Sequence, residues 1–253
     1  MLLACDIGNT NFKFALFDNE RLVRLIKVSA HKFTRAILEG LTFNDAAISS
    51  VIPDRTIELR RIFLDEYRCR PFIINQQVRF NLNIEYSTPL TLGIDRICSM
   101  EGALSLFRNH PLFPNYSKDI YILSVDSGTA TTINIVEYDK RFIGGMIMPG
   151  LETMFSSLNK NTAQLPRVTA EAVSGLIGKN TESSIASGVL NSTLGLIDRT
   201  YEYLKGEGAE DIIIYITGGN GDILSKHIRY PVIYSEDLVL QGIKAIYERN
   251  KSE

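Results

Sequence analysis

Near the start of the chain stands the stretch Asp6-Ile7-Gly8-Asn9-Thr10, which directly follows the apolar run 2–5. A buried strand thus delivers an acid into a tight turn, and the chain leaves again as a second strand. Gly8 lets the backbone approach a ligand closely, and exposed N–H groups in such a turn form an anion-binding concavity. Asp6 at the rim could hold Mg²⁺, directly or through water. An ordinary β-hairpin turn rich in Asp, Gly and Asn explains this stretch alone equally well.

A second copy of the pattern lies 120 residues further on, in Val125-Asp126-Ser127-Gly128-Thr129-Ala130-Thr131. Internal repeats decide the fold and have to be sought first. The match continues without a gap, placing Ala15-Leu16 over Ile135-Val136 and Arg21-Leu22 over Arg141-Phe142. Two related halves, each with an Asp-x-Gly phosphate turn, predict a nucleotide held in the cleft between them. Glycine-rich turns support this prediction, at Gly144-Gly145 and Thr217-Gly218-Gly219.

This duplicated arrangement resembles the acetate kinase, hexokinase, Hsp70 and actin superfamily. The resemblance implies an α/β fold of duplicated ribonuclease-H-like (actin-like ATPase) domains, one over residues 1–115 and one over 116–253. The apolar periodicity predicts the matching element order β-β-β-α-β-α-β in the first half.

The expected elements follow from apolar spacing and from Pro and Gly breaks. In the first half they are three strands over 2–29, strands over Ala46–Ile52 and Pro71–Ile74, and helices over His31–Leu41, Thr56–Tyr67 and Gly93–Phe107. Residues 75–92 are expected to form a loop, and Asn109–Lys118 the link between the halves. The second half is expected to hold three strands to Met148, strands over Ile212–Ile216 and Val232–Tyr234, a polar loop over Asn159–Ser174, and helices over Leu151–Leu158, Thr181–Leu204, Asp222–His227 and Leu238–Arg249.

The composition places the chain among ordinary globular proteins. Its 253 residues, 45% of them hydrophobic, suffice for a full core in one or two domains. A net charge of −2 gives no electrostatic footprint for nucleic acid. No apolar run approaches the length of a membrane span, and the chain opens directly into a strand without a leader pattern. The three cysteines show no metal spacing, so we expect reduced, mostly buried thiols in a cytoplasmic protein.

The pair Asp95-Arg96 is the strongest candidate for chemistry outside the two turns. It follows Gly93 at a probable helix start. A carboxylate there can accept a proton from an attacking hydroxyl, and the neighbouring guanidinium can pair with a carboxylate or a phosphate. The competing interpretation is an aspartate that satisfies the orphan N–H groups of a helix start. Spacing alone leaves both interpretations open.

The chain as a whole resembles the type III pantothenate kinases. The supporting segments occur in the family's order and cover nearly the whole chain: Asp6 to Thr10, Tyr86-Ser87-Thr88-Pro89, Leu92 to Arg96, Val125 to Thr131, Gly144 to Gly150, Thr162-Ala163-Gln164-Leu165-Pro166, Gly178-Lys179-Asn180-Thr181, Thr217-Gly218-Gly219 and Leu240-Gln241-Gly242. Each segment is weak evidence by itself, whereas the ordered set is strong. The resemblance implies ATP-dependent phosphorylation of pantothenate, the first step of coenzyme A synthesis.

The resemblance also implies a role for individual residues. ATP would bind with Mg²⁺ on the phosphate loop, with Asp6 near the Mg²⁺: Asp6, Ile7, Gly8, Asn9, Thr10, Asn11, Phe12 and Lys13, together with Thr129. Asp95 would be the general base, in a pantothenate pocket shaped by Gly93, Ile94, Arg96 and Tyr86. Asp126 would hold a monovalent cation, potassium or ammonium. Thr181 would reach pantothenate from the partner subunit, because the family's sites are completed across a homodimer.

One departure from the family pattern is Ser127, which stands where a larger apolar residue such as Phe is often expected. Its place between Asp126 and Gly128 could alter cation affinity without changing the reaction.

Two alternative functions remain open. The first is another kinase or phosphatase of the superfamily, acting on a sugar or a short acid. The second is a regulatory or binding protein on the same scaffold, against which the presence of Asp6, Asp95 and Asp126 argues. A filament-forming, actin-like role is less favoured, since the chain is short.

Overall fold

The computed structural model describes residues 1–109, 119–137, 139–173 and 175–251. The chain divides into two compact units. The first unit comprises Met1–Phe113, Lys140–Phe142 and Asp237–Glu253, and the second comprises Pro114–Asp139 and Ile143–Glu236. The predicted boundary at residues 115 and 116 lies outside the described residues, as does Ser174. Of the predicted link Asn109–Lys118, only Asn109 is described.

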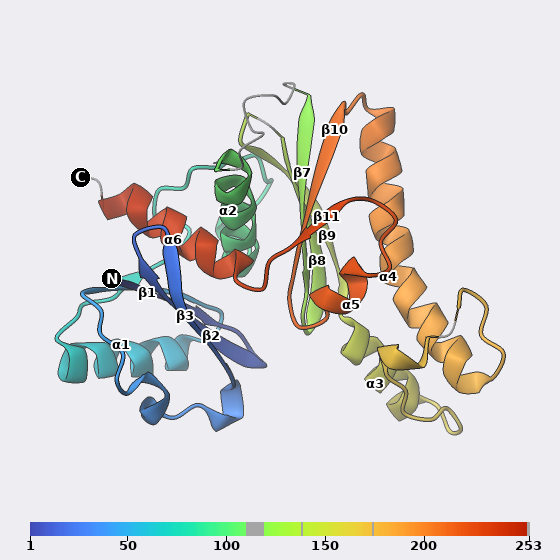
Figure 1. Ribbon diagram of the computed structural model, residues 1–253, viewed down its shortest axis with the longest axis horizontal. Helices are drawn as coiled ribbons and strands as arrows, with labels where there is room; N and C mark the ends of the chain where they lie inside the picture. The colour runs from blue at the N-terminus through green and yellow to red at the C-terminus, as the bar shows by residue number, and fades with distance from the viewer. Residues whose placement is uncertain (110–118, 138, 174, 252–253) are drawn as a thin grey trace. The chain divides into compact units, whose positions relative to one another are not determined.

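The first unit is a five-stranded sheet covered by helices on both faces (Figure 1). Its strands are β1 (Leu2–Ile7), β2 (Asn11–Asp18), β3 (Arg21–Ser29), β4 (Asp45–Ser50) and β5 (Phe72–Ile73), in the order β3-β2-β1-β4-β5. Strand β1 runs antiparallel to β2 and parallel to β4. One face packs its apolar residues on α1 (Pro53–Tyr67), through Leu59 and Phe63. The opposite face carries α2 (Ile94–Arg108) and α6 (Leu238–Lys251), which lie side by side.

The second unit repeats this topology. Its strands are β7 (Ile120–Ser127), β8 (Ala130–Glu137), β9 (Arg141–Pro149, whose first two residues belong to the first unit), β10 (Asp211–Thr217) and β11 (Val232–Tyr234). The sheet has the order β6-β9-β8-β7-β10-β11, in which β6 (Asn83–Ile84) pairs with the first two residues of β9. Strand β7 runs antiparallel to β8 and parallel to β10, as β1 does with β2 and β4. The helices are α3 (Leu151–Asn161), the long α4 (Thr181–Gly206) and the short α5 (Gly221–Ser225) (Figure 1). The predicted α/β fold of duplicated ribonuclease-H-like halves is therefore confirmed.

The two copies differ by one residue in their first turn, so the ungapped match was wrong beyond it. Ile7 pairs with Phe12 across the first turn, whereas Ser127 pairs with Thr131 across the second. The second turn is thus one residue shorter. A one-residue shift reverses which face every side chain of a strand points to. When the second turn is aligned with one residue fewer than the first, the core residues of β8 match the core residues of β2.

The predicted helix over His31–Leu41 was also wrong. The segment forms two short 3₁₀ helices, Ala30–Lys32 and Arg35–Leu38, separated by extended backbone at Phe33 and Thr34. The ring of Phe33 lies 5.1 Å from that of Phe12 and 5.7 Å from that of Phe14. Because this ring is buried in the aromatic cluster, the backbone at Phe33 is extended and the helix is interrupted. Tertiary packing therefore overrides the helical spacing of the apolar residues.

Smaller differences affect the loops. The predicted loop 75–92 contains a short strand, β6 (Asn83–Ile84), and a 3₁₀ turn over Pro89–Thr91. Helix α3 extends three residues beyond its predicted end, and a 3₁₀ turn over Ala170–Ala172 interrupts the predicted loop that follows it. Within the described part of the chain, no helix is both long and apolar enough to cross a membrane. The three cysteines are free and buried, as predicted.

Candidate active site

Asp6 stands in a row of polar side chains on one face of the first sheet. It pairs with Lys13 on β2 and with Ser49 on β4, and directly paired residues point to the same face. Lys13 is only 9% exposed, which is rare for a lysine and requires charged or polar neighbours. The turn that follows is closed by a hydrogen bond from the N–H of Gly8 to the carbonyl of Asn11, at 3.1 Å. The row thus places an ammonium group beside a carboxylate at the end of β1.

The start of α2 lies against the same row. The Cys98 thiol is fully buried, and burial raises its pKa, while a hydrogen bond with Ser49 acts in the opposite direction. The carboxylates of Asp6, Glu101 and Asp95 raise the pKa further, in that order. Asp6 and Asp95 therefore both lie near one thiol. Two of the predicted acids are thus brought near Cys98 within the first unit.

Asp95 is half-buried in the first turn of α2. One carboxylate oxygen accepts a hydrogen bond from the backbone N–H of Arg96 at 2.9 Å, so the helix-start interpretation is realised in part. A side chain at Gly93 would crowd this oxygen, because an added Cβ would lie 2.5 Å from it. Glycine at position 93 therefore leaves space for the Asp95 carboxylate.

The guanidinium of Arg96 lies beside a stacked pair of aromatic rings. It stands 5.8 Å from the ring of Tyr86 and 5.8 Å from that of Phe142. The two rings stack on each other at 5.8 Å with an angle of 22°. Arg96 is 5% exposed and Phe142 is fully buried. Sequence reasoning placed Tyr86 and Arg96 in one pocket but gave Phe142 no role in it.

Asp126 stands in the equivalent row of the second sheet. It pairs with Thr132 on β8 and with Thr217 on β10. Gly218 follows with a positive φ of 95°, and a Cβ added there would lie 2.6 Å from a carboxylate oxygen of Asp126. The hydroxyl of Thr217 is buried and has no hydrogen-bond partner among the residues that the structure describes. Sequence reasoning singled out this glycine turn, but not the hydroxyl that precedes it.

The departure at Ser127 has a local explanation. Its side chain is fully buried, and its hydroxyl lies 3.1 Å from that of Thr131, within hydrogen-bond distance. Neighbouring residues of a strand point to opposite faces, so Ser127 points away from the face that carries Asp126. Any effect of this serine on a cation held by Asp126 is therefore indirect.

Of the other predicted residues, Ile7, Phe12 and Ile94 are buried, and Asn9 and Thr10 are exposed in the first turn. Thr129 and Thr181 lie at the surface of the second unit. Thr129 is exposed in the β7–β8 turn, and its carbonyl accepts hydrogen bonds from the Gly150 N–H at 2.9 Å and the Thr153 hydroxyl at 2.7 Å. Thr181 is exposed as the first residue of α4. The helix begins there because Asn180 and Ser183 form a reciprocal capping box.

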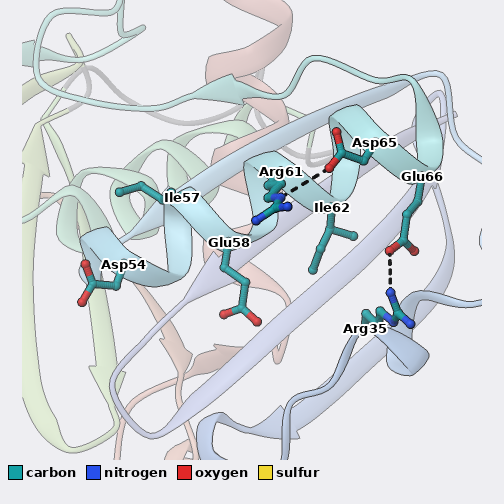
Figure 2. Close-up of a pocket in the computed structure, with 8 residues that line it drawn as sticks. All are labelled: Arg35, Asp54, Ile57, Glu58, Arg61, Ile62, Asp65 and Glu66. Atoms are coloured by element: carbon teal, nitrogen blue, oxygen red, sulfur yellow. Dashed lines mark hydrogen bonds and ion pairs between the residues drawn. The ribbon is translucent and has the colours of Figure 1, made fainter.

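Two pockets are lined by none of the predicted site residues. An apolar groove of about 500 Å³ runs between α3 and α4, lined by Pro149, Thr153, Met154, Ser157, Leu158, Ser184, Ile185, Gly188, Val189 and Ser192. A larger, charged pocket of about 650 Å³ lies on the outer face of α1 (Figure 2). Its ion pairs join Arg35 to Glu66 at 3.3 Å and Arg61 to Asp65 at 3.5 Å. It contains none of the predicted site residues. Among the described residues no cluster of three or more His, Cys, Asp and Glu could hold a metal ion.

Comparison with known families decides between the alternatives. Residues 2–203 match the model of the type III pantothenate kinase family. The chain belongs to the type III pantothenate kinase family. The type III pantothenate kinases of Citrifermentans bemidjiense and Geotalea uraniireducens are 30% and 31% identical to it. Each match covers 99% of this chain and, respectively, 100% and 99% of the relative. The predicted resemblance is confirmed over the full length, and the protein is a kinase of this family.

Solved structures support the fold. A protein from Campylobacter jejuni, described as a Baf family transcriptional activator, matches 99% of this chain and all of its own, with a TM-score of 0.56 and 23% identity. A protein from Listeria monocytogenes, described as an N-acetylmannosamine kinase, covers 98% of this chain and 99% of its own, with a TM-score of 0.51 and 13% identity. At these identities the likeness concerns the fold alone. Neither description carries the regulatory or the sugar-kinase alternative over to this member of the pantothenate kinase family.

Proposed function

We propose that this type III pantothenate kinase transfers the γ-phosphoryl group of ATP to pantothenate, giving 4′-phosphopantothenate for coenzyme A synthesis. The observation that carries the proposal is the start of α2, where Asp95 and Arg96 stand near the row of Lys13, Asp6 and Ser49. A carboxylate, a guanidinium and a phosphate turn are thereby available within one unit. These are the groups that phosphoryl transfer to a carboxylate-bearing alcohol needs.

In this proposal Asp95 is the general base. It accepts the proton of the pantothenate hydroxyl as that oxygen bonds to the γ-phosphorus, while the bond from the γ-phosphorus to the bridging oxygen of ADP breaks. Because the transition state is loose, catalysis consists largely of positioning and charge stabilisation. Arg96, which lies beside the stacked rings of Tyr86 and Phe142, supplies a guanidinium for the carboxylate of pantothenate.

ATP is proposed to bind with Mg²⁺ at the turn from Asp6 to Lys13. Mg²⁺ usually takes one or two protein carboxylates and completes its shell with phosphates and water, so a single half-buried aspartate fits it without a cluster of acids. The Mg²⁺ would neutralise charge on the phosphate oxygens. Lys13 adds a second positive charge beside Asp6. In the second unit, Thr129 is proposed to contact ATP from the β7–β8 turn.

A monovalent cation is proposed to bind at Asp126. The residues present fit such an ion, because the Asp126 carboxylate and the buried, otherwise unsatisfied hydroxyl of Thr217 both present oxygen. Leaving a buried hydroxyl without a partner is unfavourable by about 1–3 kcal/mol, and an ion would remove that penalty. Bound there, potassium or ammonium would add positive charge beside the phosphates.

The compartment proposed for the protein is the cytoplasm. Its three free, buried cysteines suit this reducing environment.

Phosphate transfer from ATP to pantothenate is expected in the presence of Mg²⁺ and potassium, and to fall by at least about 10-fold when sodium replaces potassium. Asp126→Asn should remove the difference between the two salts, because the anionic ligand is lost while the shape is kept. Initial rates of ADP release over a potassium titration measure both. Absence of turnover with pantothenate in either salt would overturn the function. Potassium activation that survives in the variant would overturn only the cation site.

The family's homodimer is proposed to form through the apolar groove between α3 and α4. The groove lies one turn of α4 beyond Thr181, the residue expected to reach the partner's pantothenate. Its floor includes Met154 and Ile185, both partly exposed. A second copy of the chain, packed on the groove, would bury these side chains and bring each Thr181 toward the other subunit.

Gly188→Glu is expected to convert the dimer to a monomer. Gly188 is exposed in the groove, and an added Cβ meets nothing within 4 Å, so the subunit itself tolerates the change. A buried, unpaired carboxylate would oppose association. Sedimentation velocity measures the outcome, and kcat/KM for pantothenate should fall together with the dimer. Gly206→Glu, at the exposed end of the same helix, is the matched control and should remain dimeric. A Gly188→Glu dimer would place the interface elsewhere.

A further inference from the structure

Glu101 is a buried acid on α2 that no step of the proposed reaction uses. It is 1% exposed, and both of its carboxylate oxygens accept hydrogen bonds from a neighbouring segment of chain. One oxygen accepts from the backbone N–H of Asn81 at 2.6 Å and from that of Leu82 at 2.9 Å. The other accepts from the side-chain amide of Asn81 at 2.9 Å. Glu101 therefore fixes the backbone of residues 81 and 82.

An acid at this position is an unfavourable choice for packing alone. The rest of α2 is buried and mostly apolar, and removing a carboxylate from water is costly unless it is fully hydrogen-bonded. Burial raises the pKa of Glu101, even though the three hydrogen bonds and the more distant Arg108 favour the charged form. A leucine or methionine would fill the space without this penalty. What the carboxylate adds is a set of directed, charge-assisted hydrogen bonds to residues 81 and 82.

Those residues begin a segment, 81–86, that we call the strap. Its next hydrogen bonds run to the start of β9: the Asn83 N–H donates to the Lys140 carbonyl at 2.8 Å, and the Glu85 N–H donates to the Phe142 carbonyl at 3.1 Å. The strap ends at Tyr86, whose ring stacks on Phe142 and lies 5.8 Å from the Arg96 guanidinium.

Helix α2 thus holds the strap at both ends. Glu101 binds its beginning and Arg96 meets its last residue, and the two lie five positions apart on one rigid helix, about 7.5 Å along its axis. The distance between Tyr86 and Arg96 is consequently set by the helix and by the hydrogen bonds to Glu101. Residue pairs that recognise a substrate need such support, because a misplacement of about 1 Å can cost roughly 100-fold in rate.

We propose that Glu101 is a positioning residue for the acceptor substrate: by anchoring the strap it holds Tyr86 against Arg96 in the geometry that receives the carboxylate of pantothenate. The inference rests on the proposed function. It assigns to Glu101 control of acceptor binding and no contact with the reacting atoms. ATP binding, which involves the turn at Asp6, should not depend on it.

The test compares Glu101→Leu and Glu101→Gln in the full-length enzyme. Glu101→Leu fills the space and removes every hydrogen bond to the strap, so KM for pantothenate should rise roughly 10- to 100-fold while KM for ATP stays within about 2-fold. Glu101→Gln keeps an oxygen for the two backbone N–H groups and should restore KM for pantothenate to within about 5-fold of wild type. Glu248→Gln is the control, since Glu248 and Glu101 line one pocket of about 310 Å³, but 48% of the Glu248 side chain is exposed.

A second variant keeps α2 unchanged. Asn81→Asp places a carboxylate opposite that of Glu101 and should give the same selective rise in KM for pantothenate, even if Glu101→Leu fails to fold. A wild-type KM for pantothenate in Glu101→Leu and in Asn81→Asp would overturn the inference. An equal rise of KM for pantothenate and KM for ATP, together with a lowered melting temperature, would also overturn it. If the wild-type enzyme itself does not phosphorylate pantothenate, the proposed function fails together with the inference. The wild-type assay therefore separates the two failures.

Discussion

Asp95→Asn is expected to lower kcat for phosphate transfer to pantothenate by about 10²–10⁴-fold, because the amide cannot accept the proton of the attacking hydroxyl. The change conserves shape, and the amide oxygen can still accept the hydrogen bond from the Arg96 N–H. The helix start should therefore form normally. Steady-state kinetics with varied ATP and varied pantothenate measure the effect, and both KM values should stay within a few-fold of wild type.

The control for this substitution is Asp65→Asn. Asp65 lies on α1 with 63% of its side chain exposed, and it pairs with the surface residue Arg61 in the charged pocket of Figure 2. Such a pair contributes little, so this variant should keep wild-type turnover. Turnover of Asp95→Asn within 3-fold of wild type would remove Asp95 as the base and leave it as a helix-start residue.

The fold could be predicted because its signals are local. The Asp-x-Gly turn appears twice, and each copy is flanked by apolar runs that form mostly buried strands in the structure. Helix α4 begins at its predicted residue, because Asn180 and Ser183 form a capping box that the sequence displays. The failure at His31–Leu41 has a non-local cause: Phe33 packs on two aromatic rings from β2, and no pattern within the segment predicts that contact.

The candidate site was predictable in part for the same reason. Asp95 and Arg96 are adjacent and follow a glycine, so the sequence itself places them together. The strap was read as a loop, because a two-residue strand gives no periodicity. One signal for it was present, however. Glu101 is a single acid in an otherwise apolar stretch of helix, and a buried acid requires donors from elsewhere in the chain. Phe142 and the hydroxyl of Thr217 became site residues only through pairing between distant strands.

Helices α2 and α6 meet at two glycines, and this contact carries the second large prediction. A Cβ added at Gly242 would overlap the carbonyl oxygen of Cys98 and lie 2.8 Å from the backbone nitrogen of Gly102. A Cβ at Gly102 would likewise overlap the carbonyl oxygen of Leu238. Backbone atoms cannot rotate away as a side chain can. Any larger residue therefore forces the two helices apart along the face of the first sheet that carries Asp6.

Gly242→Ala is accordingly expected to destabilise the protein by about 3 kcal/mol, at the upper end of typical overpacking, and to lower the melting temperature by roughly 6–12 °C. Gly206→Ala is the matched control, because its Cβ meets nothing within 4 Å and alanine favours a helix. Differential scanning calorimetry measures both. Since Cys98 lies near Asp95, Gly242→Ala should also lose kcat in proportion to the helix displacement, which Gly206→Ala should not. Equal melting temperatures for the two variants would show that α2 and α6 do not touch through their backbones.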